Sequence, residues 1–165
     1  MLFALGGMAG TAYAESKSAS YTMRVTIPPL FELEVTGPSD GVIDFEDFKR
    51  DATQTTNVSS EPVTIRARSN LGKAYQISQK LVGPLTSDTG STLPPEDLTV
   101  SATNLDKNGK ASGETTVSVD EPTPLFTSNA DGKGDTVKTS YNLKVKADSA
   151  AGTYQAKIVY SIVTL

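Results

Sequence analysis

The chain has 165 residues, enough for one domain with a buried core, and its formal net charge is -4. This acidic balance, without a cluster of Lys and Arg, excludes nucleic acid as an expected partner, because phosphate binding needs concentrated positive charge. Cys, His and Trp are absent, which excludes disulfides, thiol chemistry, and the commonest general base and metal ligand.

The chain begins with an apolar stretch, residues 1–14, that ends in Ala12-Tyr13-Ala14. A short apolar run followed by a small-x-small tripeptide is typical of a secretory signal peptide, whose cleavage would leave Glu15 as the first residue. It lacks a basic region before the apolar run, which suggests a start codon further upstream. An uncleaved anchor is disfavoured, because about a dozen apolar residues cannot span a hydrocarbon core of about 30 Å, and a buried first strand is the other alternative. We therefore predict a secreted protein.

After residue 14, strand-like alternation of apolar and polar residues recurs, with Gly, Pro, Asn and Asp between the blocks, and no stretch has a convincing helical period. The predicted strands cover residues 20–27, 30–35, 42–45, 62–68, 74–81, 97–103, 115–119, 136–147 and 153–165. Between them we expect a polar connection at 46–60, a loop at 82–95, a turn at 106–110 and a β-hairpin loop at 129–135. About eight to nine strands predict an all-β fold, an antiparallel β-sandwich of immunoglobulin-like shape.

The first predicted strand places four apolar side chains on one face: Tyr21, Met23, Val25 and Ile27. Polar residues alternate with them on the opposite face. Pro28 and Pro29 then interrupt the strand, because neither proline can donate a ladder hydrogen bond.

The last predicted strand also has one regular apolar face, formed by Tyr154, Ala156, Ile158, Tyr160 and Ile162. Val159, Val163 and Leu165 lie on its opposite face, which alternation would make polar. Both terminal blocks, 15–27 and 153–165, are about thirteen residues long, whereas strands usually have about five or six. A strand that is apolar on both faces has to lie against other residues. Either the two terminal blocks pair inside one monomer, or another chain covers the last strand.

Two clusters superficially resemble functional motifs. The loop at 129–135 has acidic and amide side chains spaced as in a calcium loop, but Lys133 stands where an oxygen ligand is needed and no bidentate Glu follows. Three acids lie close together at Asp44, Glu46 and Asp47, but no aromatic platform for a sugar accompanies them. The sequence also has no phosphate-binding loop or nucleophile elbow. We therefore expect a plain loop, solvated acids, and neither enzymatic activity nor a cofactor or metal site.

Three stretches resemble bacterial fimbrial subunits of the chaperone-usher route, in particular the alpha-type, class 5 colonisation-factor major subunits. Residues 16–35, "SKSASYTMRVTIPPLFELEV", resemble the alternating N-terminal extension of those subunits, which runs through a proline-containing segment into a first core strand. Residues 63–81, "VTIRARSNLGKAYQISQKL", resemble their strand, S/T-N turn and strand. Residues 150–165, "AAGTYQAKIVYSIVTL", resemble their final strand. The chain also resembles them in having no cysteine.

The resemblance implies an immunoglobulin-like sandwich that lacks one strand, with residues 15–29 as a donor-strand extension and residues 30–165 as the pilin domain. It implies that the apolar face of residues 21–27 fills pockets in a groove lined by the apolar face of the last strand. The expected assembly is a non-covalent homopolymer formed by donor-strand exchange. A periplasmic chaperone and an outer-membrane usher are the implied partners, and the implied location is a cell-surface fimbrium that supports adhesion or biofilm formation.

The residues alone leave a second function open. A monomeric secreted β-sandwich that binds carbohydrate or a cell-surface ligand would have the same composition and strand pattern. It would need exposed aromatic side chains gathered on one sheet or loop, whereas most Tyr and Phe residues here fall on inward-facing positions.

Overall fold

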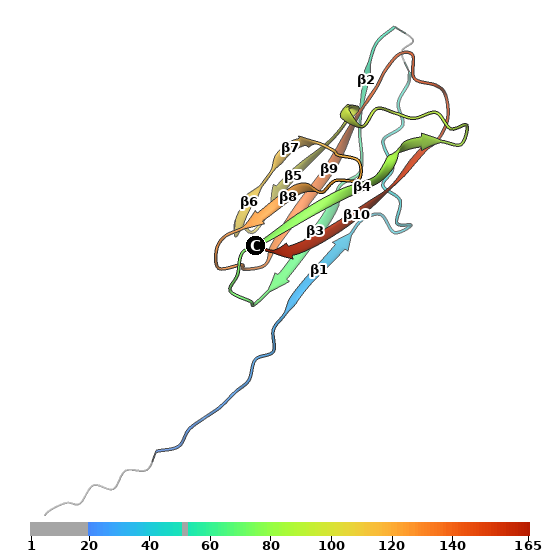
Figure 1. Ribbon diagram of the computed structural model, residues 1–165. Helices are drawn as coiled ribbons and strands as arrows, with labels where there is room; N and C mark the ends of the chain where they lie inside the picture. Colours follow the sequence, from blue (N-terminus) through green and yellow to red (C-terminus); the bar gives the residue numbers. More distant parts are fainter. Residues whose placement is uncertain (1–19, 51–52) are drawn as a thin grey trace, which may run out of the picture.

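The computed structural model describes residues 20–50 and 53–165, which fold into two antiparallel β-sheets packed face to face (Figure 1). The all-β antiparallel sandwich predicted from the sequence is confirmed. The predicted signal peptide at 1–14, and residues 15–19 of the predicted extension, lie outside the described residues.

The two sheets differ in size. The six-stranded sheet contains, in spatial order, β1 (Phe31–Thr36), β3 (Val63–Ser69), β9 (Asp135–Val145), β5 (Leu98–Asn104) and β7 (Gly113–Thr116), with β2 (Thr56–Ser59) paired to β9. The four-stranded sheet contains, in spatial order, β10 (Tyr154–Thr164), β4 (Tyr75–Ser87), β8 (Thr123–Ser128) and β6 (Gly109–Ala111). A short 3-10 turn, η1 (Pro95–Asp97), leads into β5.

The core lies between the sheets and is built largely by alternation along the strands, most regularly in β3, β5 and β9. Ile65 of β3 and Val137 of β9 are register partners in one sheet, both 0% exposed, and Ile77 of β4 is equally buried in the other. Tyr75 and Phe126 pack with ring centroids 5.9 Å apart. Burial of such side chains, worth about 1.5–3 kcal/mol each, is the main force that holds the two sheets together.

The described part of the chain contains ten strands, so the predicted number of eight to nine was slightly low. β2, β6 and β8 were not predicted, because they are short or carry a proline and show little alternation. The strand predicted at 42–45 is wrong: Phe45 makes a single bridge to Ser60. The strand predicted at 115–119 is displaced, since β7 begins at Gly113 and ends at Thr116.

The loop predicted at 82–95 is also partly wrong, because β4 continues to Ser87. Pro84 is tolerated there because β8 pairs with β4 only as far as Gln79, and beyond it β4 makes only isolated bridges, to Val119 and Thr92, apart from its pairing with β10. Gly83 has a φ of 74°, and the register with β10 shifts beside it, between Gln155 and Lys157. This irregularity has the character of a β-bulge.

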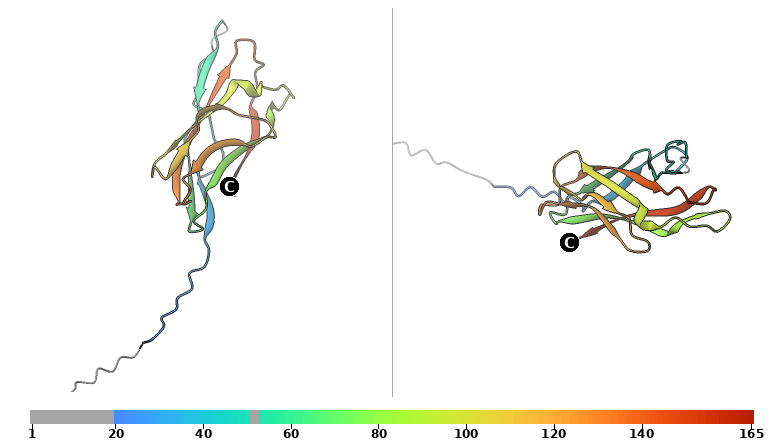
Figure 2. Two further views of the ribbon diagram at one scale, coloured as in Figure 1. Left: turned by 60° about the vertical axis from the view of Figure 1, so that its left-hand side comes forward. Right: turned by 90° about the horizontal axis from the view of Figure 1, so that it is seen from above.

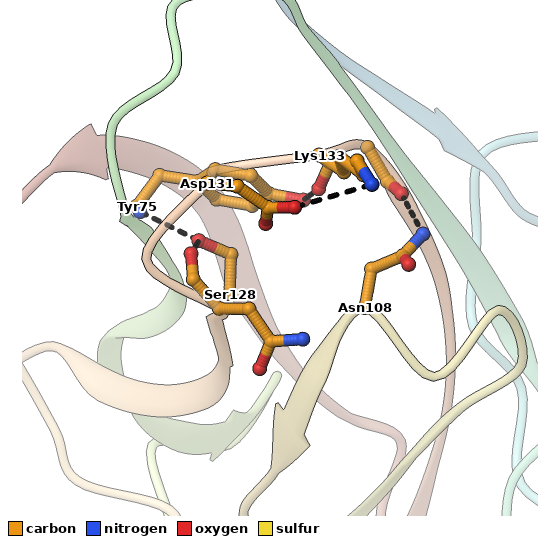
Figure 3. A network of polar contacts seen from close by, with 7 residues as sticks. Tyr75, Asn108, Ser128, Asp131 and Lys133 are labelled. Atoms are coloured by element: carbon orange, nitrogen blue, oxygen red, sulfur yellow. Dashed lines mark hydrogen bonds and ion pairs between the residues drawn. The ribbon is translucent and has the colours of Figure 1, made fainter.

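The loop at 129–135 is not a hairpin, because β8 and β9 belong to different sheets and the loop crosses between them. Figure 3 shows how it is held: the Tyr75 hydroxyl donates to the Lys133 carbonyl at 3.0 Å, and the Asn108 amide donates to the Gly134 carbonyl at 2.7 Å. The Lys133 ammonium lies 3.3 Å from the Asp131 carboxylate. The cation therefore pairs with the acid that a calcium ion would need.

Asp135, at the end of this loop, is 1% exposed and is saturated by donors. Its carboxylate accepts the backbone N–H groups of Asp106 at 3.1 Å, Asn108 at 2.8 Å and Thr136 at 2.7 Å. A side-chain donor, the Asn104 amide, lies 3.4 Å away. One buried acid thus fixes the turn after β5 against the start of β9.

We predict that Asp135→Ala lowers the free energy of unfolding by about 3 kcal/mol, because it leaves buried N–H groups without an acceptor. Asp135→Asn keeps an oxygen acceptor and should lose less. Asp131→Ala, at an exposed acid of the same loop, should change stability by no more than about 0.5 kcal/mol. Urea denaturation of the monomer measures all three; equal losses for the two alanine variants would contradict this role for Asp135.

Candidate functional site

The sandwich has two edge strands that lie side by side without pairing. β1 ends the six-stranded sheet and pairs with β3, and β10 ends the four-stranded sheet and pairs with β4. Figure 1 shows these two strands next to each other on one side of the molecule. Within residues 20–50 and 53–165, no strand pairs with the edges that β1 and β10 turn toward each other. Such edges can accept the main chain of a further strand.

An open cavity of about 1010 Å³ lies at these edges and reaches between the sheets, and we call it the groove. Its walls come from β10, from the connection after β1 as far as Arg50, from the turn before β10, and from single residues or short stretches of β1, β3, β4, β5 and β9. Its apolar lining includes Val35, Val63, Leu81, Leu85, Leu98, Tyr141, Leu143, Val145, Ile158 and Tyr160. Val63, Leu81 and Tyr141 also belong to the buried core, so the groove opens directly onto the interior of the sandwich.

The inward face of β10 is less well covered than the inward faces of the central strands. Along β9 the inward residues from Asp135 to Leu143 are fully buried, whereas along β10 they are half-buried from end to end. The five residues predicted for this face, Tyr154, Ala156, Ile158, Tyr160 and Ile162, all pack against the core. The first four line the groove, and Ile162 lies beyond it.

The outward apolar residues of β10, and Leu165 directly after it, are not covered by other described residues. Val159 is 39% exposed, Val163 51% and Leu165 65%. They belong to the outer face of the four-stranded sheet, where Val159 is the register partner of Lys80 and Val163 of Gln76.

Residues 20–29, which we call the tail, leave the sandwich at the start of β1 and run away from it in every view of Figures 1 and 2. The four apolar residues predicted to act as inserting side chains are strongly exposed: Tyr21 91%, Met23 96%, Val25 83% and Ile27 76%. The tail forms no strand and contacts neither the groove nor β10, so for residues 20–29 the alternative in which the two terminal blocks pair inside one monomer is wrong.

A chain of buried hydroxyl and amide groups lies behind the groove. The Tyr141 hydroxyl donates to the Gln79 side-chain oxygen at 2.7 Å and lies 2.8 Å from the Tyr160 hydroxyl. The Gln79 amide nitrogen is buried and has no hydrogen-bond partner among the described residues. Gln79 was not singled out from the sequence, although its place two residues after Ile77 on an alternating strand was the available signal.

The acidic cluster is solvated, since Asp44, Glu46 and Asp47 are all exposed. In the part of the chain that the structure describes, no group of three or more acidic side chains is placed to hold a metal ion. No helix between residues 20 and 165, outside the undescribed 51–52, is long and apolar enough to cross a bilayer.

Comparisons of this chain with protein-family models, with curated proteins and with solved structures find no match. The groove and the tail are therefore interpreted from their own residues.

The buried tyrosines make stability sensitive to alkaline pH. Burial, reinforced by the nearby Asp135 charge, raises the pKa of Tyr75 to about 12. Burial also raises the pKa values of Tyr141 and Tyr160. An unfolded chain ionises its tyrosines near pH 10, whereas the folded chain keeps these three neutral to higher pH.

We predict that the contribution of these tyrosines to the free energy of unfolding is constant between about pH 7 and 9 and falls as the pH rises from about 10 to 12, with about 2 kcal/mol of the fall due to Tyr75. The sign follows because the unfolded state releases protons first. Urea denaturation at a series of pH values measures the fall, and Tyr75→Phe should remove its share. A fall of unchanged size in Tyr75→Phe would show that this hydroxyl does not titrate as described.

Proposed function

We propose that this chain is a structural subunit of a bacterial surface fimbria, in which the tail of one copy inserts as a strand into the groove of the next. The observation that carries the proposal is that one chain has both an uncovered groove between two sheet edges and an exposed segment with the alternation of a strand. The sandwich is then an immunoglobulin-like domain completed by a neighbour. The assembly supports adhesion or biofilm formation.

The lengths of the tail and the groove agree. The residues of β10 that line the groove run from Tyr154 to Tyr160, and the apolar face of the tail runs from Tyr21 to Ile27. Each segment has seven residues and, at about 3.3 Å per residue, spans about 20 Å. Side chains two residues apart on the tail therefore match the spacing of inward side chains on β10.

The chemistry of the two surfaces also agrees. An inserted tail can hydrogen-bond to the free edge of β10 along the groove, which is the mode of recognition called β-strand addition. Its four apolar side chains gain about 1.5–3 kcal/mol each when they are buried. The half-buried inward residues of β10 lose their remaining exposure at the same time. Insertion therefore satisfies apolar and main-chain groups on both partners.

The proposed contact is of the kind that builds filaments. The tail and the groove are different surfaces of the same molecule, so each subunit that receives a tail still offers its own. Such a head-to-tail contact does not close on itself unless the geometry forms a ring. Export through the periplasm with a chaperone and an usher, which would cover the groove before assembly, is part of this proposal.

The runner-up, a carbohydrate-binding monomer, needs an aromatic surface. Among the described residues, the large exposed aromatic side chains are Tyr21, which is in the tail, and Phe48, which is 44% exposed at the rim of the groove. They do not form a shared surface, so no specific observation favours this function.

We predict that Val25→Asp abolishes polymer formation, because it places a charge on the face of the tail that enters the groove. The matched control is Thr26→Asp, one residue further on, whose side chain would point out of the groove and should leave assembly intact. Deletion of residues 15–27 should act like Val25→Asp. Electrophoresis in mild detergent without boiling measures the result, since linked subunits run as a ladder.

The acceptor side is tested separately. A chain with Val25→Asp still has an empty groove and should bind a synthetic peptide of residues 20–29, whereas the same peptide with Val25→Asp should not bind. A ladder of undiminished length from the deleted chain would contradict the proposal, and a single monomer band from the parent chain would favour the runner-up.

A further inference from the structure

Asn70 holds the point at which the tail leaves the sandwich. Its side-chain oxygen accepts the Leu30 backbone N–H at 2.6 Å, and its side-chain nitrogen donates to the Pro28 carbonyl at 2.9 Å. Its backbone N–H donates to the Leu30 carbonyl at 3.1 Å. One residue thus binds three backbone groups of the segment that joins the tail to β1.

The contacts are specific to an amide side chain. Asn70 follows directly on the last residue of β3, where Ser69 pairs with Phe31, and the main chain then turns toward β4. The side-chain oxygen of Asn70 binds the Leu30 N–H as a paired strand would. Because prolines have no N–H, Leu30 offers the one donor among residues 28–30, and Asn70 binds it.

The segment from Pro28 to Leu30 also disfavours a hairpin turn that would bring the tail back beside its own β1. Three residues, Pro28 to Leu30, separate Ile27 from β1. For the tail to lie antiparallel beside its own β1, these residues must form a hairpin turn, and the favoured two-residue turns need a positive φ that proline cannot adopt. To lie parallel to β1, the tail would need a crossover of about a dozen residues.

We propose that Asn70 and the Pro28–Pro29 pair form a clamp that holds the tail outward, which keeps it out of its own groove and commits it to a second copy of this chain. This inference rests on the proposed function, because it assumes that the groove accepts the tail. Asn70 is here a positioning residue: it touches the joining segment and not the groove. The clamp therefore favours an open-ended chain of subunits over a closed monomer in which the tail fills its own groove.

Cross-linking distinguishes the two outcomes, because the chain has no cysteine of its own. Arg24→Cys, on the outward face of the tail, is combined in turn with Lys157→Cys, Val159→Cys and Ser161→Cys on the outward face of β10. After mild oxidation, a non-reducing denaturing gel separates disulfides between chains, which give a ladder, from disulfides within one chain, which give a compact monomer.

In the parent chain we expect cross-links between chains. Asn70→Ala should raise the ratio of internal to external cross-links by roughly 3- to 10-fold, the effect of losing two exposed hydrogen bonds. Pro28→Asn with Pro29→Gly, which permits a hairpin turn, should add to this, and the triple variant should be mostly a closed monomer. Asn129→Ala is the matched control, at an exposed Asn of a neighbouring loop whose side chain makes no hydrogen bond with other described residues.

The outcomes separate the clamp from the proposed function. An unchanged ratio in both the Asn70 and the proline variants overturns the clamp while the proposed function stands. Absence of any cross-link, between or within chains, in parent and variants alike overturns the proposed function, and the role of the clamp with it.

A second measurement does not depend on assembly. In a chain kept monomeric by Val25→Asp, hydrogen exchange at the Leu30 amide should be slowed in the parent and about tenfold faster in Asn70→Ala. Asn70→Asp, which retains the acceptor for this amide but not the donor to Pro28, should keep much of the protection. A Leu30 amide that exchanges as fast in the parent as in Asn70→Ala would overturn the clamp.

Discussion

The main physical constraint on this molecule is that β1 and β10, the edge strands of two different sheets, lie on one side of the sandwich with no strand from residues 20–50 or 53–165 between them. Main-chain groups on both facing edges are left without a strand partner, and the core behind them is open over about 1010 Å³. Water can satisfy the polar groups, but it cannot replace the missing apolar contacts. The inward side chains of β10 are only half-buried, and the groove is open, because no described strand lies between β1 and β10.

Under the proposed function, the tail of one copy would supply the strand that the groove of the next copy lacks. It has alternate apolar side chains, free main-chain groups and a matching length, and it belongs to a chain whose own groove it does not fill. Apolar side chains this exposed are costly in water, and this cost supports the proposal that the tail is buried against another molecule. The prolines and the contacts of Asn70 with Pro28 and Leu30 lie at its base, between the proposed donor segment and the folded domain.

Other parts of the sandwich are held by close packing and by buried hydrogen bonds. Asp135 fixes the turn after β5, and the crossing loop is packed so closely that a Cβ on Gly132 would lie 1.8 Å from the Lys73 carbonyl oxygen. The Tyr141 and Gln79 hydrogen bond stiffens the wall behind the groove, which faces the core. A groove held open by such a frame loses little entropy when a strand enters it, and preorganisation of this kind favours binding.

By itself, the sequence determined the all-β sandwich and the long last strand, because alternation with period two is a local property of residues such as those of β9 and β10. It also showed which face of each terminal block is apolar. It did not reveal β2, β6 or β8, which are strands because of their neighbours rather than their own pattern. The tertiary structure alone decided that residues 20–27 lie apart from the last strand, that β1 and β10 leave a groove, and that Asn70, 40 residues further along the chain, binds Leu30. Pairing between distant strands depends on the whole fold, and no local pattern encodes which edges remain free.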